Sequence, residues 1–420
     1  MVAYEKVHPE PKQRHRYFHY CCFLALLFTF ITLYTFGLLA LTKKQADDAE
    51  IAASAGKRLV CYYSSAGPAK LSLLDVPGNL CTHINIGIAN LSNTTLEIPP
   101  DLAAVLQNET CLFREKNPQV KLLLWIGGGD SGHEFAEMVV NHETRKQFIR
   151  SVRDVLKQYP SLDGIDLDWE FPSACDKERQ HFSQLLYEIR MEWIREKLPD
   201  NILSLAVAAP EGIAYFAYDM QQINLYVDYV NLMAYDFHFY RKDMPFTGLN
   251  APLFARAKES SIMATFNINY TVNWWLKNGL EPQRLVVGLP TFGHSYTLVS
   301  PFNSRVGAPA RGIGKCGEAG FTTLTATCEC IKTFFAPNLY FDRQTCSPYL
   351  SAIMEWISYE NAASISCKAH YIKAMNLGGI MVFSLNTDDL KNKCGYMGPR
   401  AHTPAFPLVE TAKRILLPHY

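Results

Sequence analysis

The sequence lacks an excess of charge of either sign. Its 420 residues include 40 lysines and arginines and 40 aspartates and glutamates, so the formal net charge is zero. Beyond the N-terminal segment there is also no basic run with interleaved aromatic residues. Proteins that bind nucleic acids usually present a basic face to the phosphate backbone. We therefore expect no nucleic-acid partner.

Pairs of closely spaced cysteines of the kind that hold zinc are also missing. Cys328 and Cys330 form one close pair, and no second pair lies at metal-binding spacing. The chain nevertheless contains 12 cysteines, which is unusual for a cytosolic enzyme. Four Asn-x-Ser/Thr glycosylation sites accompany them: Asn90, Asn93, Asn108 and Asn269. Both features predict that most of the chain faces the secretory lumen or the cell exterior.

One long apolar segment separates the N-terminus from the rest of the chain. Residues 19–42 contain no lysine, arginine, aspartate or glutamate and are long enough to cross the ~30 Å hydrocarbon core of a membrane. Residues 1–18 are polar and basic, so we expect a cytoplasmic tail. We interpret residues 19–42 as the transmembrane signal anchor of a single-pass type II protein, followed by a stalk at 43–56. The alternative is a cleaved signal peptide and a secreted protein.

Short apolar runs alternate with helical patterns through most of the remaining chain. The runs are continuously apolar, which is typical of parallel strands buried on both faces. They span residues 58–64, 81–88, 120–126, 164–170, 202–208, 229–234, 285–290 and 379–385. Helical patterns lie between them, for example at 146–159, 177–197, 261–277 and 362–376. Eight strands, most of them followed by a helix, predict an α/β fold, the (β/α)8 or TIM barrel.

The predicted barrel domain, residues 57–397, contains one connection that is too long for a simple loop. Residues 293–356, after the seventh strand, carry several cysteines and turn residues. We interpret this connection as a small α+β insertion. Residues 398–420 are expected to form a short C-terminal tail.

Four carboxylates lie within eight residues at the end of the fourth predicted strand: Asp163, Asp166, Asp168 and Glu170. Alternate side chains of a strand share one face, so the last three would point the same way at roughly 6.6 Å spacing. Acids this close cannot all ionise normally, and at least one should hold a proton near neutral pH. A calcium loop would need a glycine and a glutamate that are not in register here. Because active sites of such barrels lie at the carboxyl ends of the strands, the acids predict a catalytic site.

This stretch, Asp163-Gly-Ile-Asp-Leu-Asp-Trp-Glu170, resembles the Asp-x-x-Asp-x-Asp-x-Glu signature of glycoside hydrolase family 18, the chitinases and chitinase-like lectins. Other segments resemble further strands of the family: Leu59-Val-Cys-Tyr-Tyr63, Leu80-Cys-Thr-His-Ile84, Asp228-Tyr-Val-Asn-Leu-Met-Ala-Tyr-Asp-Phe-His238, Val287-Gly-Leu-Pro-Thr-Phe-Gly293 and Leu377-Gly-Gly-Ile-Met-Val-Phe-Ser384. The resemblance covers roughly residues 57–397. It implies hydrolysis of β-1,4 bonds in chitin or N-acetylglucosamine oligosaccharides, with no metal or cofactor.

The resemblance implies a catalytic role for three of the acids. Family 18 enzymes are a substrate-assisted exception among retaining glycosidases. Glu170 would protonate the glycosidic oxygen, while the acetamide carbonyl of the substrate attacks the anomeric carbon. Asp168 would accept the acetamide N–H, and Asp166 would share a proton with Asp168. Asp163 lies out of phase with this set and is expected to have a structural role in the turn.

The resemblance also implies substrate contacts and disulfides. Five residues are expected to bind the substrate: Tyr62, Met233, Tyr235, Asp236 and Phe383. Tyr235 would hold the acetamide oxygen, and Phe383 would form the floor of the reactive subsite. Two disulfides are expected, joining Cys61 to Cys81 and Cys330 to Cys394.

The chain departs from the family at several aromatic positions. Tryptophans expected along the cleft are replaced by the Ser65-Ala66-Gly67 segment, by Gly129 and by Phe383. The tyrosine of the seventh-strand motif is Phe292 in this chain, and the arginine that follows the motif is His294. Each lost aromatic contact should weaken binding of a long chitin chain by ~0.5–1.5 kcal/mol. The complete acid set favours a hydrolase, and the reduced set of platforms favours the alternative, a non-catalytic lectin that binds N-acetylglucosamine-containing glycans.

Overall fold

The computed structural model describes residues 28, 56–173, 177–259, 261–395 and 406–418. Among these residues no helix is long and apolar enough to span a membrane. The predicted anchor, residues 19–42, lies outside the described part of the chain except for residue 28. The following paragraphs concern residues 56–418, which form one compact unit.

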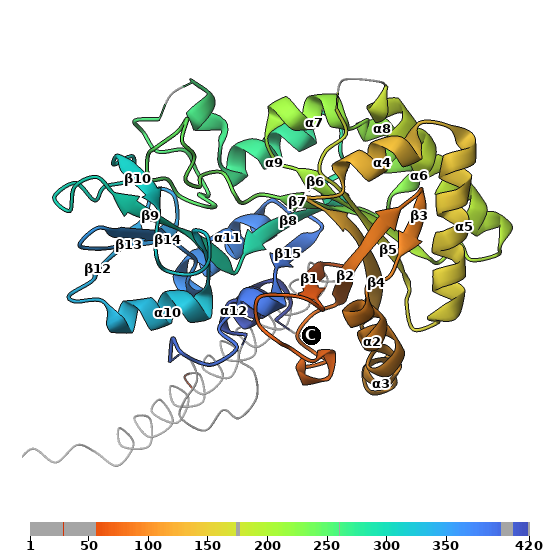
Figure 1. Ribbon diagram of the computed structural model, residues 1–420, viewed down its shortest axis with the longest axis horizontal. Helices are drawn as coiled ribbons and strands as arrows, with labels where there is room; N and C mark the ends of the chain where they lie inside the picture. Colours follow the sequence, from red (N-terminus) through yellow and green to blue (C-terminus); the bar gives the residue numbers. More distant parts are fainter. Residues whose placement is uncertain (1–27, 29–55, 174–176, 260, 396–405, 419–420) are drawn as a thin grey trace, which may run out of the picture. The chain divides into compact units, whose positions relative to one another are not determined.

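A closed barrel of eight parallel strands forms the centre of this unit (Figure 1). Its strands are β1 (Arg58–Ser64), β2 (His83–Ser92), β4 (Lys121–Gly128), β5 (Gly164–Trp169), β6 (Ile202–Ala208), β7 (Tyr229–Met233), β8 (Leu285–Pro290) and β15 (Gly379–Phe383). Neighbours follow the chain order, and β1 closes the barrel by pairing with both β15 and β2. The short strand β3 (Thr95–Glu97) pairs antiparallel with the end of β2. The α/β barrel predicted from the sequence is confirmed.

Helices connect the strands. They are α2 (Pro100–Asn108), α3 (Thr110–Lys116), α4 (Gly132–Val139), α5 (His142–Gln158), α6 (Glu178–Arg195), α7 (Glu211–Ala217), α8 (Met220–Tyr226), α9 (Ile268–Lys277), α11 (Ala362–Ala374) and α12 (Pro407–Leu416). Four 3-10 turns accompany them: η1 (Leu73–Asp75), η2 (Ser261–Thr265), η3 (Pro282–Arg284) and η4 (Leu385–Thr387). Asparagine side chains cap several helices; Asn141, for example, accepts the backbone N–H of Thr144 at the start of α5.

The chain segment between β8 and α11, for which the sequence predicts an α+β insertion, forms an antiparallel sheet beside the barrel (Figure 1). Its elements are β9 (Phe292–Leu298), β10 (Ala310–Ile313), β11 (Phe321–Thr323), α10 (Leu324–Thr333), β12 (Asn338–Asp342), β13 (Ser347–Ala352) and β14 (Glu355–Ser358). The first strand, β9, begins two residues after β8 ends, so the insertion starts at the carboxyl end of the barrel.

The side chains of β5 divide between two environments. Ile165, Leu167 and Trp169 belong to the core between the strands and the outer helices. Asp166 and Asp168 alternate with them and are buried on the other side, in the barrel interior. The predicted orientation of these acids is thereby confirmed.

The segment expected to form the C-terminal tail contains a helix. Helix α12 lies within residues 398–420, and its side chains Leu408, Val409 and Ala412 are buried in the main core. Asp388 accepts the backbone N–H groups of Leu408 and Val409 at distances of 3.1 and 3.2 Å, which anchors the start of this helix. The helical spacing of the apolar residues in this segment is the sequence signal that indicates the helix.

One predicted disulfide is confirmed and the other is wrong. Cys61 is joined to Cys81 as expected. Cys394 is joined to Cys328 and not to Cys330, which instead pairs with Cys316. Cys328 and Cys330 lie two residues apart on α10, hence about 200° apart around the helix axis, and only one of them can face Cys394. A fourth disulfide joins Cys346 on the insertion to Cys367 on α11.

The predicted glycosylation sites differ in exposure. Asn90, Asn93 and Asn108 are exposed on the surface. Asn269 is half-buried, and its side-chain oxygen accepts the hydroxyl of Tyr371 at 3.0 Å.

Candidate active site

The carboxyl end of β5 carries the acidic cluster. Strand β5 pairs with β4 and β6, so that Asp166 lies beside Trp125 on one side and Ser204 on the other. Asp166 is fully buried and Asp168 is 3% exposed. Glu170 follows the end of the strand and is half-buried. Asp163, before the strand, instead accepts the backbone N–H of Leu122, in keeping with its predicted structural role.

Asp166 is surrounded by hydrogen-bond donors. The hydroxyls of Tyr62 and Ser204 donate to its two oxygens at 2.5 Å each, and the Asn231 amide donates at 3.0 Å. Burial raises the pKa of Asp166, while these three hydrogen bonds oppose the rise because they favour the carboxylate. Asp166 is therefore the acid of the cluster best able to hold a negative charge.

Asp168 has fewer hydrogen-bond donors than Asp166. The indole N–H of Trp125 donates to its Oδ2 at 2.9 Å, and its Oδ1 is buried without a hydrogen-bond partner. Burial raises the pKa of Asp168 well above its usual range, and the charges of Glu170 and Asp166 raise it further. Asp168 is thus the acid of the cluster whose charged form the folded chain favours least. Among the described residues no hydrogen bond joins it to Asp166, so the shared proton expected from the sequence is not seen here as a direct contact.

Glu170 has the properties of a general acid. Burial raises its pKa, and the negative charges of Asp236 and Asp130 raise it further. A carboxyl group with a raised pKa can retain a proton at the pH at which it must donate one. No lysine or arginine contributes to the raised pKa values of Asp168 and Glu170.

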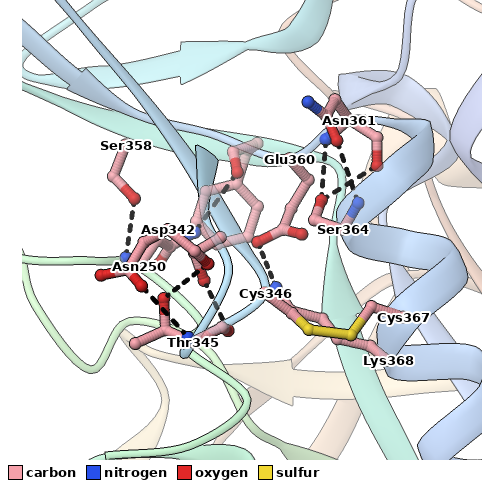
Figure 2. Close-up of polar contacts among 12 residues, drawn as sticks. Asn250, Asp342, Thr345, Cys346, Ser358, Glu360, Asn361, Ser364, Cys367 and Lys368 are labelled. Carbon is pink, nitrogen blue, oxygen red and sulfur yellow. Dashed lines mark hydrogen bonds and ion pairs between the residues drawn. A yellow bond between two sulfur atoms is a disulfide. The ribbon is translucent and has the colours of Figure 1, made fainter. Parts of the chain in front are cut away.

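Asp236 is held close to this centre by the β7–α9 connection. Its φ is +57°, a left-handed conformation that an aspartate tolerates in a tight turn. Its backbone N–H donates to Asn250 Oδ1 at 2.9 Å, and its Oδ1 lies 2.6 Å from Nε2 of His294. The backbone N–H of Asn250 donates to the hydroxyl of Ser358 on β14, as Figure 2 shows. The insertion therefore helps to position a charge that acts on Glu170.

Aromatic rings fill the barrel interior around the acids. Trp125 packs edge-on against Tyr62 at 4.9 Å and against Phe383 at 5.7 Å between ring centroids. Phe383 is half-buried and also lies 5.8 Å from the ring of Tyr235. The Tyr235 hydroxyl makes only a weak contact, 3.9 Å from the sulfur of Met381, so it can donate to a ligand.

Two other residues expected to bind substrate lie at different depths. Tyr62 is buried with its hydroxyl on Asp166 and therefore positions that acid. Met233, at the end of β7, is half-buried and packs against the interior cluster that includes Tyr235. The structure thus brings Met233, Tyr235 and Phe383 together beside the acids, with Tyr62 beneath them.

The surface next to Glu170 lacks an aromatic side chain at position 129, where the family is expected to have a tryptophan. Gly129 is exposed, and a Cβ placed there would lie 3.8 Å from Oε1 of Glu170. A cavity of about 380 Å³ lies beside Asp236 and is lined in part by Phe239, Arg241 and Glu211. Phe239 is 42% exposed and packs on His294 at 5.7 Å, so one aromatic ring does line this side of the site.

Four residues of the site were not predicted from the sequence: Trp125, Ser204, Asn231 and Asn250. Ser204 and Asn231 are polar residues inside otherwise apolar strands, and this is the signal that could have identified them. Trp125 is 3% exposed and lies inside the barrel, so it is no surface platform for a sugar. Within the described part of the chain, no group of three or more potential ligands could hold a metal ion.

Comparisons with known proteins agree with this geometry. The sequence profile of the family described as Glycosyl hydrolases family 18 matches residues 58–388. Chitotriosidase-1 of Mus musculus is 32% identical over 378 residues, which cover 86% of this chain and 78% of that protein. Chitinase-3-like protein 2 of Homo sapiens is 30% identical over 375 residues, covering 86% of this chain and 92% of that protein.

Solved structures of both catalytic and non-catalytic proteins are similar to this one. YKL-39, crystallised with chitooligosaccharides, has a TM-score of 0.78 and 29% identity, covering 86% of this chain and 99% of that chain. Human YKL-39 is described as a pseudo-chitinase that retains chitooligosaccharide binding. The Group IV chitinase of Ostrinia furnacalis, in complex with allosamidin, has a TM-score of 0.78 and 31% identity, with coverage of 86% and 98%.

Proposed function

Since the chain belongs to the family 18 glycosyl hydrolases, we propose that it hydrolyses β-1,4 bonds next to N-acetylglucosamine units by substrate-assisted catalysis. One observation carries this proposal. Asp168 in the barrel interior and Glu170 just after the end of β5 interact electrostatically, and burial and negative charges raise the pKa values of both. Such an arrangement costs stability and suits proton transfer.

The reaction uses the residues as follows. Glu170 donates its proton to the glycosidic oxygen, and the leaving sugar departs as an alcohol. The acetamide carbonyl oxygen forms a bond to the anomeric carbon, which gives an oxazolinium ion. Asp168 accepts the acetamide N–H, and Tyr235 donates its hydroxyl to the acetamide oxygen. Water then attacks the anomeric carbon, the bond from this carbon to the acetamide oxygen breaks so that the acetamide is restored, and Glu170 takes a proton from the water.

The negative charge of Asp166 supports the same step. Its three donors hold it in place without neutralising it. A fixed negative charge in a water-excluded site stabilises a developing cation more than it would in solvent. Phe383, beside Tyr235, provides an apolar surface against which the reacting sugar can lie.

The proposal includes a location. Four disulfides in the described chain fit an oxidising compartment. The uncharged segment at 19–42 would anchor the chain as a type II membrane protein with the barrel on the extracellular or lumenal side. Accessibility of the barrel to a protease added outside intact cells tests this location.

A second candidate, a lectin that binds N-acetylglucosamine-containing glycans without cleaving them, is favoured by one observation. Gly129 leaves the surface beside Glu170 without an aromatic platform. Similar proteins include a pseudo-chitinase that retains chitooligosaccharide binding. Such a protein would bind the oligosaccharide with wild-type affinity whether or not Glu170 is present.

Release of a fluorophore from a chitotriose glycoside distinguishes the two functions. The wild-type chain should release it, and Glu170→Gln should reduce the rate about 10²–10⁴-fold. Asp163→Asn is the control, because it removes a carboxylate of the same sequence signature that lies outside the inward-facing set. Equal rates for the wild type and Glu170→Gln would refute the hydrolase, and unchanged affinity would then support the lectin.

A further inference from the structure

The hydrogen bond from Trp125 to Asp168 has no role in the reaction as described above. Trp125 lies on β4 and is almost fully buried, yet its indole N–H points at a carboxylate and not at a backbone carbonyl. It is the one donor that the described residues supply to Asp168, on Oδ2. The other oxygen, Oδ1, is buried with no partner. A buried acceptor without a donor is costly, which points to a ligand donor at Oδ1.

The surroundings of Trp125 restrict its ring to one place. Tyr62 and Phe383 contact it edge-on. On the β2 side stands Gly87, where an added Cβ would lie 2.7 Å from Cε3 and 2.9 Å from Cβ of Trp125. Any larger residue at position 87 would push the indole away. Gly87 and Trp125 therefore form a matched pair that brings the indole N–H to Asp168.

Trp125 thus differs from the donors of Asp166. Tyr62 and Ser204 carry hydroxyls that can turn or exchange donor and acceptor roles. An indole can only donate, and its direction is set by the packed ring. Asp168 cannot rotate away from Trp125 without leaving the indole N–H unsatisfied in the barrel interior.

We propose that Trp125 is a positioning residue that fixes the Asp168 carboxyl group through Oδ2 and thereby presents Oδ1 to the acetamide N–H of the substrate. This inference rests on the proposed function, because it assigns Oδ1 the role of acetamide acceptor. A 2-acetamido sugar supplies a donor for Oδ1 through its N–H.

The substitution Trp125→Phe keeps an aromatic ring, removes the donor and reduces the side-chain volume, and the Trp356 control below has the same loss of volume. With the full-length chain in mild detergent, we expect kcat for a chitotriose glycoside to fall about 10–100-fold, with KM changed by less than about threefold. The hydrogen bond from Trp125 opposes the rise in the pKa of Asp168, so its loss should move the acid limb of the pH profile to higher pH. Trp356→Phe is the matched control, because Trp356 is also buried and donates its indole N–H to a backbone carbonyl far along the chain, that of Ser304.

A double-mutant cycle separates positioning from general damage. In the Asp168→Asn background, Trp125→Phe should cause little further loss of kcat, because its effect acts through the carboxylate. Full additivity of the two losses, or a Trp125→Phe rate equal to wild type, would overturn the inference. Thermal unfolding of each variant reports whether the fold is retained.

Failure of the proposed function would give a different pattern. If the wild type releases no fluorophore, hydrolysis is refuted, and the inference is decided by binding of a chitotriose that ends in a thiazoline ring, a stable analogue of the oxazolinium ion. Weaker binding by Trp125→Phe in an Asp168-dependent manner would support the positioning role. Equal affinity for the wild type and Trp125→Phe would overturn it.

Discussion

Two of the places in which the protein buries charged side chains, the Glu360–Lys368 pair and the acids of β5, differ in how the charges are balanced. On one side of the barrel, Lys368 of α11 and Glu360 before it form an ion pair at 2.5 Å, with side chains 0% and 1% exposed (Figure 2). The Asn361–Ser364 capping box and the Cys346–Cys367 disulfide lie close by in the same view. The acids of β5 are equally buried, but no cation is paired with Asp166 or Asp168.

The two groups of buried charges differ in how their pKa values are balanced. Burial raises the pKa of Glu360 and lowers that of Lys368, and each partner opposes the shift of the other. A buried ion pair, in which the two charges balance each other, can have a purely structural role. Buried acids without a cation destabilise the folded chain at neutral pH, and those of β5, unlike Asp388 at the start of α12, cap no helix, which fits the proposed proton chemistry.

The largest effect is expected for Asp168→Asn. Activity should fall about 10²–10⁴-fold, because an asparagine at this position cannot take a negative charge as positive charge develops on the substrate. The same substitution should make the stability of the folded chain less sensitive to rising pH. The pKa of Asp168 lies well above the unfolded value of 3.8, so the wild type loses stability as pH rises from about 4 towards neutral. The variant should lose less in urea unfolding across that range, and an equal or steeper loss would contradict this account.

Breaking the Glu360–Lys368 ion pair should lower the stability of the fold and leave catalysis unchanged. Lys368→Met leaves Glu360 buried without a partner and should cost about 3–5 kcal/mol of unfolding free energy. Glycosidase activity per folded molecule should not change. The double variant Glu360→Gln, Lys368→Met should recover most of the loss, as measured by urea midpoints. Lys157→Met removes an exposed partner of Glu196 and serves as the control, with little change expected. A small effect of Lys368→Met would contradict the structural role.

A smaller effect is expected when a permanent charge is added next to the acids. Asp236 raises the pKa of Glu170 and itself contacts His294. His294→Arg should offset that charge and lower the pKa of Glu170, so the alkaline limb of kcat/KM should move to lower pH by roughly 0.3–1 unit. His370→Arg, on the exposed face of α11, should leave the limb in place. A shift of the His294→Arg limb to higher pH would show that Asp236 does not act on Glu170 in this way.

Much of the barrel could be predicted because its signals are local. The bounds predicted for β1, β6 and β8 coincide with those of the structure, since each is a continuous apolar run between turn residues. The acids of β5 were identified by alternation along one strand. Helix α12 was not predicted, although its buried residues Leu408, Ala412 and Leu416 follow one another at helical spacing.

Features that depend on contacts between distant strands could not be predicted. The partner of Cys394 depends on which side of α10 faces it, which spacing does not reveal. Trp125 and Gly87 are far apart from Asp168 in the sequence, and only the closed barrel brings them together. The same holds for Asn250, whose contacts with Asp236 and Ser358 join the β7–α9 connection to the insertion.

The anomeric form of the first product tests the central claim most directly. When a chitooligosaccharide is cleaved and followed by proton NMR from the first minutes, substrate-assisted catalysis by Glu170 and Asp168 predicts that the new reducing end appears as the β-anomer, before mutarotation. A new reducing end that appears first as the α-anomer would contradict this mechanism. No cleavage at all would contradict the hydrolase.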